Sequence, residues 1–213
     1  MRLPLAFLIT AAAASAQIGI PESLQPQGVK PEMVEFKGRK AIKLTEAPGA
    51  QGDGQMCVLK GETIQDGTIE LWLSGEPAPG AVTGARGFVG VAFRVQGPNK
   101  YEAFYLRPTN GRAPDQVRRN HSAQYIAHPD YPWQRLRKEF PEKYEAYVDL
   151  QPAEWTRVKI VVKGKTAQLF VHGSEQPTLI VNDLFLGQTP GGVALWIGPG
   201  TVAHFADFKL THQ

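Results

Sequence analysis

Residues 101–138 concentrate side chains that bind anions and sugars. They include seven Arg or Lys residues against three Asp or Glu residues, a local net charge of +4, while the whole chain carries a formal charge of +3. Arginine guanidinium groups bind carboxylate, sulfate or phosphate through paired hydrogen bonds. Aromatic rings stack on the apolar face of a sugar, whose hydroxyl groups need polar partners. The candidate ligand-binding residues are Arg94, Arg107, Arg118, Arg119, Asn120, Gln124, Tyr125, Asp130, Tyr131 and Trp133.

The same residues also fit a purely structural role. We expect a strand at residues 101–107, ended by Pro108, and then a long irregular segment that reaches Trp133. Long irregular segments are uncommon in compact domains and are often functional. Alternatively, Arg–Asp pairs pin this segment to the sheet, and its Tyr and Trp side chains form a small core of their own. The sequence leaves both interpretations open, and they do not exclude each other.

Two arrangements of side chains fit catalysis. Cleavage of a glycosidic bond typically uses two carboxylates a few ångströms apart. Glu70 and Glu102 come from neighbouring expected strands, and we predict that they face one groove. His121 is a candidate general base that Asp115 or Asp130 would orient. The candidate catalytic residues are therefore Glu70, Glu102, His121 and Asp115.

The sequence indicates no cofactor and no transition-metal site. His121, His128 and Asp130 have suitable chemistry for a metal ion but lack a recognised zinc spacing. The glycine-rich stretches lack the Lys-Ser/Thr ending and the following helix of a phosphate-binding loop. The single cysteine, Cys57, excludes an intramolecular disulfide, and we expect it to be a buried thiol in a strand.

The N-terminus has the pattern of a secretory signal peptide. Arg2 precedes an apolar stretch at residues 3–14, and Ala14-Ser15-Ala16 is a small-x-small cleavage site. We expect residues 1–16 to be removed, leaving a single domain over residues 17–213 that is secreted or periplasmic. No second apolar stretch is long enough to span a membrane. The mildly basic charge, without a run of Lys and Arg, does not indicate nucleic acid as a partner.

The rest of the chain has the pattern of short strands. Ile69, Leu71 and Leu73 alternate with more polar residues, and residues 154–162 repeat this alternation. A period of two places each apolar set on one face of a sheet, which we expect to face the core. Residues 101–107 carry aromatic and charged side chains on both faces, so their inward face stays unassigned. About a dozen such strands, with no long amphipathic helix, predict an all-β fold: a two-sheet sandwich of antiparallel strands.

Two runs of the sequence resemble known families. Four features follow one another in the run EWTRVKIVVKGKTAQLFVHGSEQPTLIVNDLFLGQTPGGVALWIGPGTVAHFADFKL. They are a Trp-led strand, a Lys-Gly turn, a His-Gly-Ser turn and the segment Gly-Gly-Val-Ala-Leu-Trp. This order resembles the C-terminal half of a concanavalin A-like, laminin-G-like jelly roll. The upstream run GFVGVAFRVQGPNKYEAFYLRP is similar to the central strands of the bacterial DUF1080 family, the 3-keto-disaccharide hydrolase domains. Together the resemblance covers roughly residues 67–210, and the Leu-Phe-Asn-Gly type of opening that such domains carry is missing.

The resemblance implies a jelly-roll fold and, from the second family, a hydrolase activity without assigning catalytic residues. It also leaves room for calcium on loop carboxylates and carbonyls, although no Asp-rich loop of the EF-hand kind is present. Our first hypothesis is an exported jelly-roll domain that binds anionic or modified carbohydrate where Arg107 and residues 118–133 meet the sheet. The alternatives are a glycoside hydrolase of the 3-keto-disaccharide hydrolase type and a module that binds a protein partner.

Overall fold

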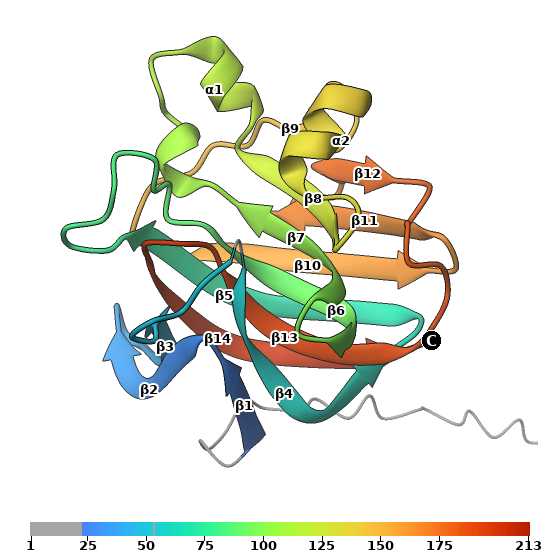
Figure 1. Cartoon of the computed structure of the whole chain (residues 1–213), viewed down its shortest axis with the longest axis horizontal. Helices are drawn as coiled ribbons and strands as arrows, with labels where there is room; N and C mark the ends of the chain where they lie inside the picture. The colour runs from blue at the N-terminus through green and yellow to red at the C-terminus, as the bar shows by residue number, and fades with distance from the viewer. Residues whose placement is uncertain (1–22, 53) are drawn as a thin grey trace, which may run out of the picture.

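The computed structural model describes residues 23–52 and 54–213. The expected signal peptide, its cleavage site and Gln17 lie outside the described residues. The described chain forms two antiparallel sheets of seven strands each, packed face to face as a sandwich (Figure 1). The expectation of an all-β, two-sheet antiparallel sandwich is therefore confirmed. No helix among the described residues has the length and apolar character needed to cross a membrane.

The first sheet carries the segment that the sequence singled out. Its strands, in spatial order, are β1 (Leu24–Gln27), β4 (Gln55–Ile64), β13 (Gly191–Ile197), β6 (Val89–Gly97), β7 (Lys100–Leu106), β8 (Ala123–His128) and β9 (Glu145–Ala146).

The second sheet packs against the first and is the better predicted of the two. Its strands, in spatial order, are β12 (Leu179–Val181), β11 (Thr166–Val171), β10 (Thr156–Lys163), β5 (Gly67–Pro77), β14 (Thr201–His212), β3 (Arg39–Glu46) and β2 (Val29–Phe36). The alternation in β5 places Ile69, Leu71 and Leu73 in the core, each at most 1% exposed. Val158 and Ile160 of β10 face the same core, so the period of two correctly assigned the inward faces of these strands.

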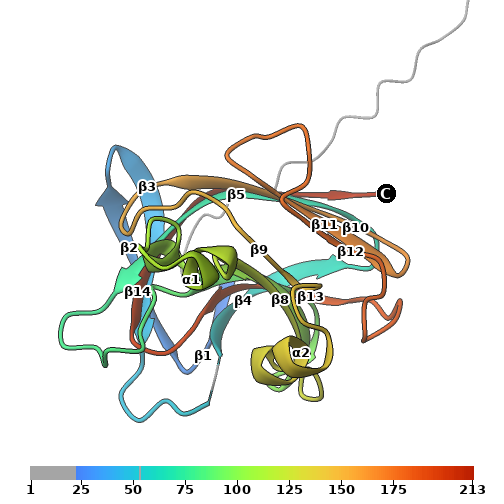
Figure 2. The same cartoon turned by 90° about the horizontal axis from the view of Figure 1, so that it is seen from above.

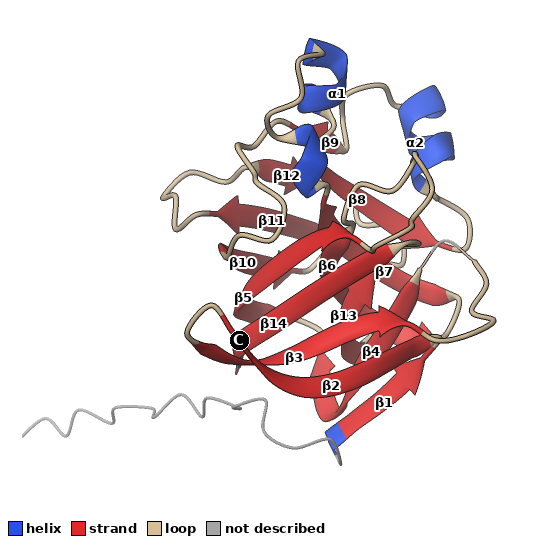
Figure 3. Ribbon diagram, turned by 90° about the vertical axis from the view of Figure 1, so that its left-hand side faces the viewer, coloured by secondary structure: helices blue, strands red, loops and turns tan. Residues whose placement is uncertain are grey.

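Three short helices gather at one end of the sandwich, beside β8 and β9 (Figures 2 and 3). They are the 3₁₀ helix η2 (Pro108–Asn110), α1 (Gln116–Asn120) and α2 (Trp133–Glu139). The segment expected to be irregular thus contains two of these helices and a full strand, β8, before Trp133 opens α2. Every residue from 123 to 127 is buried, so β8 shows no alternation and its pattern could not be recognised. Strand β9, which follows α2 in the chain, extends only over Glu145–Ala146.

The structure assigns the inward face of β7. Glu102, Phe104 and Leu106 face the second sheet, in register with Phe93, Val91 and Val89 of the neighbouring strand. Tyr101, Ala103 and Tyr105 lie on the outer face of the first sheet, and Arg107 continues that face just beyond the end of the strand. Both faces are buried, because loops and α2 cover the outer one. This explains why aromatic residues occupy both faces of the strand.

Candidate functional site

A cavity of about 490 Å³ lies at the helical end of the first sheet. We call it the arginine cavity, because four guanidinium groups line it. Its size falls in the range of 300–1,000 Å³ that is usual for ligand sites. The lining residues come from the β5–β6 loop, the β7–α1 connection, α1 and α2; they are Gly84, Arg86, Phe88, Arg107, Asn110, Asp115, Val117, Arg118, His121, Trp133 and Arg137.

Helix α1 positions Arg118 in this cavity. Asp115 caps the helix by accepting a hydrogen bond of 2.7 Å from the Arg118 backbone N–H. The Arg118 guanidinium donates to Asn110 Oδ1 at 2.9 Å and to Thr109 Oγ1 at 3.1 Å. Asn110 in turn donates to the backbone carbonyl of His121 at 3.0 Å. The short helix and the β7–α1 connection are therefore held together by side-chain hydrogen bonds, which orient the Arg118 guanidinium.

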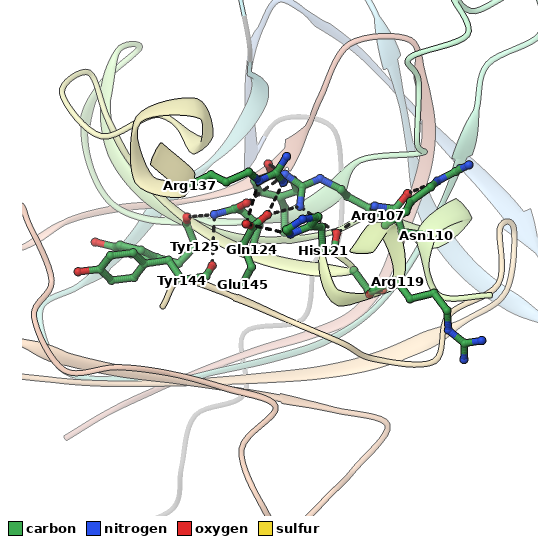
Figure 4. A network of polar contacts seen from close by, with 12 residues as sticks. Arg107, Asn110, Arg119, His121, Gln124, Tyr125, Arg137, Tyr144 and Glu145 are labelled. Atoms are coloured by element: carbon green, nitrogen blue, oxygen red, sulfur yellow. Dashed lines mark hydrogen bonds and ion pairs between the residues drawn. The ribbon is translucent and has the colours of Figure 1, made fainter. Parts of the chain in front are cut away.

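The Glu145 carboxylate contacts three cationic or titratable side chains, those of Arg107, His121 and Arg137 (Figure 4). Its carboxylate accepts hydrogen bonds from Arg107 at 3.2 Å and from Arg137, whose Nε lies 3.0 Å away. Burial alone would raise the pKa of Glu145, but the hydrogen bond from Arg137 and the charges of Arg107 and Arg137 outweigh it and hold the pKa below its usual value. Glu145 therefore stays ionised and fixes two of the four arginines in the cavity wall.

His121 also faces this carboxylate. Its Nδ1 lies 2.9 Å from Glu145 Oε2, although the two atoms are not aligned for a straight hydrogen bond. Burial lowers the pKa of His121, and the nearby charges of Arg137 and Arg107 act in the same direction, while Glu145 opposes them. The ring is thus neutral at pH 7 and adds no positive charge to the cavity.

Arg86 and Arg118 supply the positive charge that the protein does not neutralise. Within residues 23–52 and 54–213 neither forms a salt bridge with a carboxylate; Arg86 donates to the backbone carbonyls of Thr83 and Ala85 instead. Burial and the charges of Arg118 and Arg107 lower the pKa of Arg86, as expected where cations crowd together without a matching anion. The cavity is therefore suited to an anionic group.

A second cavity, of about 240 Å³, adjoins the first on the outer face of the sheet. We call it the aromatic cavity. It shares Gly84, Phe88 and Trp133 with the arginine cavity. The rings of Tyr105 and Trp196 form its floor, with centroids 4.8 Å apart. The remaining lining residues are Val82, Ala85, Ile126, His128, Gln134, Gly198 and Pro199.

Five of the candidate residues from the sequence lie in the arginine cavity: Arg107, Asp115, Arg118, His121 and Trp133. Gln124 supports it from below, because its Oε1 accepts a hydrogen bond of 3.1 Å from Arg107. Asn120 lies beyond His121, in a smaller hollow with Glu142 and Tyr147. The orienting partner of His121 is Glu145, so the prediction that Asp115 or Asp130 would orient it is wrong.

Arg94, Glu102 and Tyr125 are inaccessible to a ligand, because each is fully buried between the sheets. Arg94 has φ of 50°, in the left-handed region, where the β6–β7 register shifts. This bulge breaks the alternation and turns the guanidinium inward onto the backbone carbonyls of Gln65, Gly164 and Gly187. Arg94, a candidate ligand-binding residue in the sequence, therefore lies in the core and not at a ligand site.

Glu70 and Glu102 do not face one groove, and that prediction is wrong. Glu70 lies in β5 of the second sheet, where it pairs with Arg157 at 3.3 Å. Glu102 lies in the other sheet, accepts a hydrogen bond of 2.6 Å from the Tyr125 hydroxyl, and has a pKa raised by burial. These two carboxylates therefore cannot act together on one glycosidic bond.

The other predicted ligand-binding residues pack on neighbouring elements instead of lining a cavity. The Tyr131 ring stacks on Phe185 with centroids 3.6 Å apart, and Arg119 donates to the Tyr147 hydroxyl at 2.8 Å. Asp130 is exposed, and its backbone carbonyl accepts a hydrogen bond from Arg135. Loop pinning, the structural alternative, thus describes part of this segment.

The residues that sequence reasoning missed are Arg86, Phe88, Asn110, Arg137 and Glu145; of these, only Arg137 belonged to the positively charged cluster recognised in the sequence.

A metal site finds no support in the donor set. Within the part of the chain that the structure describes, no group of three or more His, Cys, Asp or Glu side chains is arranged to hold a metal ion. Calcium on loop carboxylates and carbonyls stays a prediction from the resemblance, and we derive no chemistry from it.

Comparison with known proteins identifies the fold. No protein-family model matches the sequence, and no curated protein matches it. Among solved structures, the carbohydrate-binding module CBM66 from Bacillus subtilis has a TM-score of 0.62 at 9% identity, covering 89% of this chain and 95% of its own. The Emp47p carbohydrate recognition domain has a TM-score of 0.55 at 11% identity, covering 90% of this chain and 89% of its own. A Bacillus licheniformis β-glucanase has a TM-score of 0.52 at 13% identity, covering 96% of this chain and 100% of its own.

These similarities define the fold as a concanavalin A-like jelly roll, as the sequence predicted. Identities this low show the fold alone, since one fold serves many functions. The resemblance to 3-keto-disaccharide hydrolase domains stays a prediction.

Proposed function

We propose that this protein binds carbohydrate that carries a carboxylate or sulfate group, with the charged group in the arginine cavity. One observation carries the proposal: Arg86 and Arg118 line a cavity beside Trp133 without a carboxylate partner among the described residues. The guanidinium groups match the paired oxygens of an anion, and the indole matches the apolar face of a sugar ring.

The jelly-roll neighbours support this choice of ligand class. Two of the similar structures are a carbohydrate-binding module and a carbohydrate recognition domain by their names. The signal-peptide pattern at residues 1–16 supports export, as expected for a protein that meets extracellular glycans. The excess positive charge on the cavity wall favours acidic over neutral glycans.

A glycan array tests the proposal with the purified protein. Acidic glycans should bind more strongly than neutral glycans of the same backbone. Arg118→Ala should weaken that binding by roughly ten- to a hundredfold, because a hydrogen bond to a charged group contributes about 1.5–3 kcal/mol.

Arg112→Ala is the matched control. Arg112 lies in the same connection, but it pairs with Asp149 at 2.7 Å and does not line the cavity. Equal binding of acidic and neutral glycans, or equal losses in the two variants, would contradict the proposal. If no glycan binds and the only ligand found is another folded protein, the alternative function of a protein-interaction module would be indicated.

Cleavage of the bound glycan is a second candidate function, favoured by the position of His121. Its ring lines the arginine cavity, and its Nδ1 lies 2.9 Å from Glu145 Oε2. A rotation of the ring that aligns these two atoms would give a general base with an orienting carboxylate. Glycans that bind on the array should be incubated with the wild type and with His121→Asn, and their products analysed. Products that form only with the wild type would establish an enzyme, whereas intact glycans would leave a binding protein.

A further inference from the structure

We propose that the arginine and aromatic cavities form one composite site that recognises an acidic sugar unit linked to a neutral one. The acidic unit occupies the arginine cavity and the neutral ring occupies the aromatic cavity. This inference rests on the proposed function and deepens it, because it specifies the sequence of units in the glycan.

The two cavities are continuous around shared side chains. Gly84, Phe88 and Trp133 line both. The Trp133 ring has the Arg137 guanidinium over it, 4.7 Å from the ring centroid. Trp133 therefore belongs both to the cationic wall and to the aromatic wall, and a chain of sugars passing from one cavity to the other crosses it.

Tyr105 joins the two cavities chemically. Its hydroxyl accepts a hydrogen bond of 2.7 Å from Arg107 Nη2. Its ring meanwhile packs on Trp196 in the floor of the aromatic cavity and lies edge-on to Phe88, with centroids 6.1 Å apart. One side chain thus contacts both an arginine of the cationic wall and the aromatic floor, so the two subsites fit adjacent units of one ligand.

The chemistry of the aromatic cavity differs from that of its neighbour. Four aromatic rings line it, those of Phe88, Tyr105, Trp133 and Trp196. None of its lining residues, all within the described chain, is Arg, Lys, Asp or Glu. Gly198 lets the backbone approach Phe88 closely, since a Cβ there would lie 2.7 Å from Phe88 Cβ. Such a surface stacks on the apolar face of a neutral sugar.

The same surface disfavours a second charge. The cations nearest to these rings, Arg107 and Arg137, are already paired with Glu145. A carboxylate placed in the aromatic cavity would therefore lose water without gaining an unpaired cation, and burial of an unpaired charge is costly. An oligosaccharide in which acidic and neutral units alternate should therefore bind more tightly than one in which every unit is acidic.

Titration calorimetry on the purified protein tests this order of units. The probes are hyaluronan oligosaccharides, which alternate glucuronate with a neutral N-acetylated sugar, glucuronoxylan fragments, and all-acidic oligogalacturonates of equal length. We expect at least one alternating or mixed probe to bind roughly three- to tenfold more tightly than the all-acidic probes, which corresponds to one stacked ring.

A charge introduced into the aromatic cavity provides an independent test. Gln134 is exposed on α2 and lines only the aromatic cavity, so Gln134→Lys adds a cation there without disturbing the core. This variant should shift the preference toward oligogalacturonate. Gln176→Lys is the matched control, because Gln176 is exposed in the β11–β12 loop and lines neither cavity. It should leave the preference unchanged.

The outcomes separate this inference from the function on which it rests. If acidic glycans bind but the all-acidic probes bind as tightly as the mixed ones, and Gln134→Lys changes nothing, the composite site is refuted while the proposed function stands. If no acidic glycan binds, both are refuted. A mixed-probe preference that Gln134→Lys reverses and Gln176→Lys retains supports the composite site.

Discussion

Replacing Glu145 by glutamine would remove the charge that holds the wall of the arginine cavity. The Glu145 side chain is 4% exposed and that of Arg107 is 5% exposed, so water does not replace the lost interaction. Removing one partner of a buried ion pair costs about 3–5 kcal/mol, because the other charge stays buried and unpaired. Arg137, with a side chain 35% exposed, recovers part of its interaction from water. We expect Glu145→Gln to lower the free energy of unfolding by about 3 kcal/mol, the lower end of that range.

Urea unfolding followed by tryptophan fluorescence measures this loss, with Glu139→Gln as the control. Glu139 pairs with Arg135 one helical turn away, and the two side chains are 42% and 43% exposed. Exposed helical pairs of this kind contribute about 0.3–0.5 kcal/mol. A loss for Glu145→Gln no larger than that for Glu139→Gln would refute the reasoning, because Glu145 would then behave as a surface carboxylate.

Acidification should reduce the difference between the wild type and this variant. Although burial alone would raise it, the pKa of Glu145 is lowered in the folded protein, chiefly by Arg137 and Arg107. The carboxylate therefore contributes its full stability above the unfolded-state pKa of about 4.3, and this contribution is lost as the pH falls through the folded-state pKa. The difference in unfolding free energy should shrink below about pH 4. A difference that stays constant from neutral to acidic pH would contradict the assigned ion pairs.

Three further predictions concern other parts of the molecule. Burial lowers the pKa of His204 from 6.5 to about 4. As the pH falls, the unfolded chain binds a proton at His204 at a higher pH than the folded protein does, so the stability that is complete above pH 6.5 is lost between pH 6.5 and about pH 4. His204→Phe should remove this decrease in the free energy of unfolding measured with urea; the same decrease in the variant would argue against a buried neutral His204. Burial raises the pKa of the Cys57 thiol to about 11, so a thiol reagent at about pH 8 should label the protein only in urea, and rapid labelling of the native protein would disprove this. Higher ionic strength should weaken acidic-glycan binding by the wild type more than by Arg118→Ala, as measured by calorimetry; equal salt dependence would exclude a charge role for Arg118.

Local patterns predicted the elements whose two faces differ. In β5 and β10 one face is buried and the other meets water, so apolar residues such as Ile69 and Ile160 recur with a period of two. Strands β7 and β8 are buried on both faces, which removes the alternation of apolar and polar residues. The strand at residues 101–107 was expected, but its inward face could not be assigned. The strand at residues 123–128 was missed because this alternation is absent, although the excess positive charge of residues 101–138 had marked this part of the chain as a candidate site.

The assembly of the site depends on contacts between distant segments. Arg86, Arg118 and Arg137 come from a loop and two short helices that meet only at the end of the folded sheet. Glu145 is separated from Arg107 by 38 residues, and no local pattern connects them. A bulge at Arg94 similarly turns inward the side chain of a candidate ligand-binding residue, and no sequence pattern predicted this bulge.

The sequence by itself therefore determined the all-β class, the two-sheet sandwich and the region of excess positive charge, because these follow from composition and from periodicities within single segments. Only the tertiary structure decided which charges are neutralised and which face a cavity. Glu102 and Arg94 are buried in the core, while Arg86, recognised by no sequence pattern, lines the cavity. The physical reason is that burial and ion pairing are properties of the packed sheets, and residues far apart in the chain determine them together.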